Sequence, residues 1–68
     1  QNKCISTIIK DYNSYTVVST SDCETIAIKL SNMSLEEGLN LINNREDTEA
    51  LWYLDKESTK SNNFNKYE

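Results

Sequence analysis

The spacing of hydrophobic and polar positions predicts a run of strands in the first half of the chain. The apolar residues of 4–12 fall on one helical face, yet most of them are β-branched, which favours a strand. We therefore expect a strand over 4–12 and keep a helix as the alternative. Residues 15–20 predict a second strand, after a turn at residues 11–14. Residues 25–30 alternate between apolar and polar side chains, a period of two that predicts a third strand.

The second half begins with a helix signal. Ser34 and Glu37 form a capping box, in which the hydroxyl and the carboxylate each satisfy a free backbone amide. Leucine and isoleucine then recur at helical spacing and predict a helix over 34–44. Gly38 costs this helix roughly 1 kcal/mol relative to Ala, so it is either required for close packing or merely tolerated. Residues 50–54, an apolar run with two aromatics, predict a last strand, with a single helical turn as the alternative.

These elements predict one α+β domain over residues 1–55, in which one helix packs on a small antiparallel sheet of three to four strands. Residues 56–68 are mostly Lys, Ser, Asn and Thr, with only Phe64 and Tyr67 apolar, so we expect a disordered polar tail. The expected core consists of Ile9, Val17, Ile26, Ile28, Leu30, Leu35, Leu39, Ile42, Leu51 and Trp52.

Cys4 and Cys23 are the two cysteines of the 68-residue chain. Such a short chain buries a limited core and commonly needs a disulfide, a metal or a partner. In the expected sheet the start of the first strand lies beside the end of the second, and a helix over 4–12 would also bring the two cysteines close. A disulfide there would contribute roughly 3 kcal/mol. The alternative is two free buried thiols, but small size and an even count favour the disulfide and, with it, a periplasmic or secreted protein.

The composition offers little to catalysis or to metal binding. The chain has no His, which is the commonest general base, and two cysteines cannot close a four-ligand zinc site alone. Glu36 and Glu37 suit the first turn of the expected helix rather than the two sides of a cleft. The net charge of −4 argues against nucleic-acid binding, which needs a basic surface. We therefore expect no enzyme, no cofactor, no metal site and no nucleic-acid partner.

Two groups of side chains are candidates for binding a protein partner. Tyr12 and Tyr15 flank the first turn, where tyrosines often take part in recognition. Trp52 and Tyr53 face opposite ways in a strand, so we expect Trp52 in the core and Tyr53 at the surface. The second group lies in the charged connection after the helix and would suit a basic partner. It consists of Glu46, Asp47 and Glu49.

The chain also resembles, as a class, the phage-encoded superinfection-exclusion lipoproteins. The likeness lies in the short chain, the Cys4–Cys23 pair and the frequent Asn, Lys, Ile and Tyr. It implies a periplasmic protein that inactivates an outer-membrane β-barrel receptor, tethered by a lipidated Cys ahead of Gln1. We accordingly predict a monomeric, exported binding or blocking protein. The alternatives are an acidic immunity or inhibitor protein that neutralises a toxin, and a small secreted toxin or effector.

Overall fold

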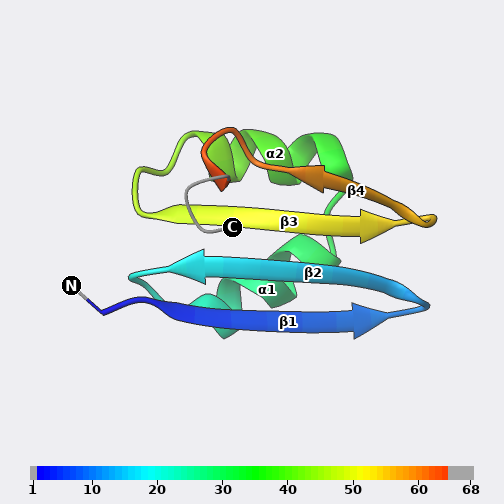
Figure 1. The fold of residues 1–68 in the computed structure, drawn as a ribbon, viewed down its shortest axis with the longest axis horizontal. Coiled ribbons are helices and arrows are strands. Elements are labelled where there is room, and N and C mark those ends of the chain that lie inside the picture. The colour runs from blue at the N-terminus through cyan, green and yellow to red at the C-terminus, as the bar shows by residue number, and fades with distance from the viewer. Residues whose placement is uncertain (1, 65–68) are drawn as a thin grey trace.

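The computed structural model describes residues 2–64, which form an antiparallel sheet with two helices behind it (Figure 1). The spatial order of the strands is β1-β2-β3-β4, and each strand runs antiparallel to its neighbours. The chain places both helices between β2 and β3. The elements are β1 (Cys4–Lys10), β2 (Asn13–Ser19), α1 (Cys23–Ser31), α2 (Leu35–Asn43), β3 (Thr48–Leu54) and β4 (Glu57–Lys60).

Both hairpins of the sheet close through two-residue turns with left-handed backbone. The β1–β2 turn holds Asp11 at φ 54° and Tyr12 at φ 69°. The β3–β4 turn holds Asp55 at φ 53° and Lys56 at φ 67°. Two successive positive φ angles are typical of type I′ turns, whose twist matches that of the flanking strands. The Asp55 amide donates to the Asn13 Oδ1 at 3.2 Å, and Figure 1 shows the two turns at the same end of the sheet.

Helix α1 replaces the third strand that we expected over residues 25–30, so the domain has two helices rather than one. Asp22 caps the helix: its carboxylate accepts from the Thr25 amide at 3.3 Å and from the Thr25 hydroxyl at 2.7 Å. The buried side chains of α1 recur at helical spacing, which the two-residue alternation of the apolar residues concealed. They are Cys23, Ile26, Ala27 and Leu30.

Helix α2 confirms the predicted helix and its capping box. The Glu37 amide donates to the Ser34 hydroxyl, and the Ser34 amide donates to the Glu37 carboxylate, both at 3.2 Å. Gly38 faces the sheet, where a Cβ atom would lie only 2.9 Å from Cζ2 of Trp52 and 3.2 Å from Cδ2 of Leu30. The glycine therefore lets the helix approach the indole ring closely.

The core lies between the helices and the sheet face that they cover. Val17, Ile42 and Trp52 are fully or almost fully buried there, as expected. Two members of the expected core are instead exposed: Ile9 by 76% and Ile28 by 46%. Ile9 points to the other side of β1, because its neighbour in the strand takes the inward position, and Ile28 lies on the solvent side of α1. Ile26 and Leu30 are buried in the core, and Leu35 and Leu39 are half-buried against it. Leu51, also expected in the core, is half-buried on the opposite face of the sheet, because it alternates with the inward-facing Ala50 and Trp52.

The prediction of a disordered tail from residue 56 onward is wrong for residues 56–64. Strand β4 pairs with β3, and beyond it the Ser61 amide donates to the Ala50 carbonyl at 2.9 Å. Ser61 and Phe64 are both buried, and the Asn62 amide donates to the Asn43 side chain at 2.9 Å. These bonds give the segment the stabilisation that its polar composition does not suggest. Tyr67 lies outside the described residues.

The predicted disulfide between Cys4 and Cys23 is present, with 6.0 Å between the Cα atoms. Cys4 opens β1 opposite Ser19, the last residue of β2, and Cys23 opens α1 directly after the connecting loop. The bond thus fastens the edge strand of the sheet to the first turn of the first helix.

Candidate protein-binding surface

The face of the sheet opposite the helices, here called the outer face, carries the exposed hydrophobic side chains of the strands. Strand alternation and pairing define its members. No cavity or cleft is found within residues 2–64, and Val18 and Glu49 are buried on this face, so its exposed part is the place to look for a protein contact. The outer face consists of Ile5, Thr7 and Ile9 from β1, Ser14, Thr16 and Val18 from β2, Glu49, Leu51 and Tyr53 from β3, and Ser58 and Lys60 from β4.

At the end of the outer face near the two turns, the exposed side chains of Ile9 and Tyr53 lie on either side of Ser14. Ile9 pairs with Ser14, and Ser14 pairs with Tyr53. Tyr53 is 44% exposed, as expected for the partner of an inward-facing Trp52. Together with Tyr12 at the tip of the first turn, Ile9 and Tyr53 make up what we call the turn-end surface. The sequence reading missed Ile9 because it placed that residue in the core.

Tyr12 is the most exposed large hydrophobic side chain of the described residues, at 97%. Its left-handed backbone is a conformation that Gly or Asn adopts more readily, and a bulky residue there is uncommon. The local structure thus holds an aromatic ring in solvent at a position where a smaller residue would be less strained. The exposed aromatic ring, rather than the backbone conformation that Lys56 shares, makes Tyr12 the leading candidate for contact with a partner.

Tyr15 does not join this surface. It sits on the inner face of β2, 9% exposed, and belongs to the hydrophobic core cluster. Because Tyr12 is in the turn and Tyr15 is in a strand two residues past its start, the two rings have different environments. Of the aromatic candidates, Tyr12 and Tyr53 remain accessible.

The acidic candidates do not form one exposed patch. Glu46 is exposed, but Asp47 is half-buried and Glu49 is only 4% exposed. The Glu49 carboxylate accepts a short hydrogen bond from the Ser61 hydroxyl and another from the Asn63 amide at 3.2 Å. This carboxylate is therefore occupied in holding the segment after β4 against the sheet.

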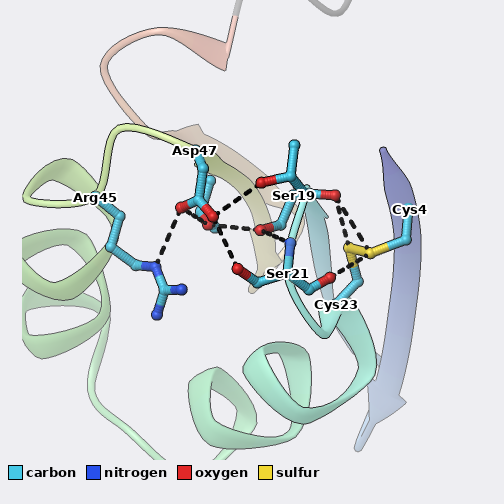
Figure 2. Close-up of polar contacts among 8 residues, drawn as sticks. Cys4, Ser19, Ser21, Cys23, Arg45 and Asp47 are labelled. Carbon is cyan, nitrogen blue, oxygen red and sulfur yellow. Dashed lines mark hydrogen bonds and ion pairs between the residues drawn. A yellow bond between two sulfur atoms is a disulfide. The ribbon is translucent and has the colours of Figure 1, made fainter. Parts of the chain in front are cut away.

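Asp47 likewise has a structural role, in a network that reaches towards the disulfide (Figure 2). Its carboxylate accepts from the hydroxyls of Ser21 at 2.8 Å, Thr48 at 2.8 Å and Thr20 at 3.0 Å. Arg45 forms a half-exposed ion pair with it, at 3.6 Å. The hydrogen bonds, that from Ser21 first, hold the pKa of Asp47 well below its ordinary value.

The same network continues to the sulfur atoms. The hydroxyl of Ser19 is 2.7 Å from the hydroxyl of Thr48 and accepts from the Ser21 amide at 3.0 Å. Sγ of Cys4 lies 2.9 Å from the Ser21 carbonyl oxygen and 3.3 Å from that of Ser19. The loop between β2 and α1 is thus fixed on one side by the disulfide and on the other by Asp47, as Figure 2 shows. We therefore assign the residues of this network a role in stabilising the fold.

No protein family model, no curated protein and no solved structure matches this chain. None of the helices described between residues 2 and 64 is long and apolar enough to span a bilayer. Over the same residues, no three His, Cys, Asp or Glu side chains are grouped as a metal site would require. The chemistry of the surface is therefore the basis for a functional proposal.

Proposed function

We propose that the protein is a small exported binding protein that blocks a protein partner by covering part of its surface with the turn-end surface of Ile9, Tyr12 and Tyr53. The single observation that supports this most strongly is Tyr12, 97% exposed on left-handed backbone. Large aromatic side chains supply most of the binding energy at many protein interfaces, since each buries much apolar area with few rotatable bonds.

The disulfide supports the exported location. Such bonds persist in oxidising compartments and are rare in the reducing cytosol. The rigid frame also supports binding, because a preorganised surface loses little conformational entropy when a partner docks. Hairpin β1–β2 is held at one end by the Cys4–Cys23 bond and at the other by the contact between Asn13 and Asp55.

As the partner we propose an outer-membrane β-barrel receptor, approached from the periplasm, as in the superinfection-exclusion lipoproteins that the chain resembles. The proposed action is blockade: the bound domain keeps the receptor from being used by an incoming phage. The acidic inhibitor alternative loses support, because two of its three carboxylates, Asp47 and Glu49, accept hydrogen bonds within the domain.

The test is a binding experiment with solubilised outer-membrane proteins and the purified domain, comparing the natural protein with Tyr12→Gly. Glycine suits left-handed backbone, so this change keeps or raises stability while it removes the aromatic ring. We expect it to weaken receptor binding about tenfold or more, the loss typical of an interface hot spot.

Lys56→Gly is the matched control. It makes the same backbone change at the equivalent position of the neighbouring turn, where φ is 67°, and leaves both tyrosines in place. This variant should bind like the natural protein. Recovery of no receptor by the natural protein would refute the proposed partner, and equal binding by Tyr12→Gly would refute the proposed surface.

A further inference from the structure

Strand β1 forms one edge of the sheet, and alternate residues of this strand direct their backbone amides and carbonyls to the open side. In a two-residue hairpin the residues that flank the turn form a hydrogen-bonded pair, here Lys10 and Asn13. Alternate residues of β1 from Lys10 backwards therefore direct their amides and carbonyls to β2. The intervening residues direct theirs to the open edge, and these are Ile5, Thr7 and Ile9.

The edge carries few of the features that usually prevent strand pairing. Natural edge strands are commonly interrupted by proline, by a bulge or by charged side chains in the middle of the strand. Strand β1 pairs with β2 without a bulge through seven consecutive residues, and its charged residue, Lys10, stands at the end. Ile5 and Ile9 are 69% and 76% exposed on either side of Thr7.

The residues of this edge are complementary to a second copy of themselves. Antiparallel pairing centred on Thr7 places Ile5 opposite Ile9 of the other copy, and Thr7 opposite its own equivalent. Ile5, Thr7 and Ile9 all present outward backbone groups, so each of these three positions can form a hydrogen-bonded pair with the other copy. β-branched pairs of this kind stabilise a sheet.

Charge complementarity favours the same register. One step beyond each end of the strand, Lys3 would lie near Asp11 in the turn of the other copy, and symmetry makes this contact twice. Both residues are exposed. Opposite charges across paired strands add a modest stabilisation, whereas a shift of two residues in either direction would lose both contacts and both isoleucine pairs.

We propose that two copies of this chain associate through their β1 edges, antiparallel and centred on Thr7, into one continuous sheet. The twofold axis runs perpendicular to the sheet and keeps the helices of both copies on the same side. Edge pairing leaves Tyr12 and Tyr53 of the turn-end surface open and places Ile9 beside Ile5 of the other copy, so the proposed blocking function does not depend on this proposal. It replaces the monomer that the sequence alone suggested.

The test is the molar mass in solution, by light scattering or sedimentation equilibrium, from micromolar to millimolar protein. The mass should rise from 7.8 kDa towards twice that value. In the dimer, an isotope-filtered NOE should connect the α protons of Ser6 and Ile8 in different copies, since this non-hydrogen-bonded pair brings the Cα atoms to about 4.5 Å. A constant monomer mass, or a dimer without this NOE, overturns the proposal.

Thr7→Pro removes an outward amide that makes no bond to β2, a position where an edge strand tolerates proline. We expect it to abolish the dimer. The matched control is Ser58→Pro, at an exposed outward position of β4, the opposite edge, which should leave the dimer intact. Thr7→Lys, which places like charges face to face, provides a second test should the proline variant unfold. It should weaken association about fivefold or more. A dimer that persists unchanged in a folded Thr7 variant overturns the proposal.

Discussion

Gly38 offers the sharpest test of the packing between α2 and the sheet. In Gly38→Ala the new methyl group would lie 2.9 Å from Cζ2 of Trp52 and 3.2 Å from Cδ2 of Leu30. Both neighbours are almost completely buried, with Trp52 1% and Leu30 0% exposed. The indole ring is rigid and has little room to move, so either the helix or the ring must shift.

Two opposing effects set the magnitude. Alanine is the better helix former, which favours Gly38→Ala by roughly 1 kcal/mol. Adding a methyl group to a well-packed core typically costs 1–3 kcal/mol, about 2 kcal/mol at mid-range. The contact of 2.9 Å is closer than a Cβ atom normally tolerates, so we place the cost in the upper part of that range. The expected net effect is a loss of about 1–2 kcal/mol, and each kcal/mol lowers the Tm of a domain of this size by roughly 4–8 °C.

The assay is equilibrium unfolding in urea, with Asn40→Ala as the control. Asn40 is exposed on the same helix, so its replacement should raise stability by a few tenths of a kcal/mol, through propensity alone. A double-mutant cycle with Trp52→Phe isolates the clash: without the second ring, the penalty of Gly38→Ala should shrink or reverse. Gly38→Ala that is as stable as the natural protein would refute the reasoning.

Three further predictions concern the bonds that hold the domain together. Replacing Cys4 and Cys23 with serine should lower the unfolding free energy by roughly 3 kcal/mol, and an unchanged urea midpoint would contradict this. The lowered pKa of Asp47 means that its stabilising contribution is complete above the ordinary pKa of about 3.9 and is lost at lower pH. The melting temperature should therefore fall as the solution is acidified below pH ~4, and it should fall less steeply in Asp47→Asn. Ser61→Ala leaves the buried Glu49 without its hydroxyl donor and should cost about 1–3 kcal/mol in urea unfolding.

The reliable sequence signals were those in which several local features agreed. Around α2, the Ser34 and Glu37 pair and the leucine spacing all indicate a helix, and the structure has one. For the last predicted strand, the alternation that buries Trp52 and exposes Tyr53 also held. The two cysteines came together because the hairpin register places Cys4 beside the end of β2.

The error at α1 has a physical cause. Ile26, Ile28 and Leu30 alternate as in a strand, but Ile26 and Leu30 are also one helical turn apart, so the pattern fits both structures. The deciding features were Asp22, which caps the helix, and Cys23 and Ala27, which extend the buried stripe. A cap residue directly before the segment was the available signal.

The segment after β4 could not be predicted because its bonds are not local. Ser61 is a small polar residue like many others in the chain, and it is buried because Ala50 and Glu49 lie opposite it in the folded sheet. The environments of the acidic candidates could not be predicted for the same reason. The acids near residue 47 are adjacent in sequence, yet folding turns Glu49 towards the C-terminal segment and leaves Glu46 exposed.

The position of Cys4 at the start of β1 determines which end of the domain an attachment ahead of it would hold. Strand β1 runs from Cys4 to the turn that carries Tyr12, and the molecule is 33 Å along its longest dimension. Figure 1 shows the tips of the domain, which are the β1–β2 and β3–β4 turns, at the opposite end of the sheet from the beginning of β1. A sensor chip, affinity tag or linker joined ahead of Cys4 therefore holds the domain by its far end and leaves both tips free to meet an analyte.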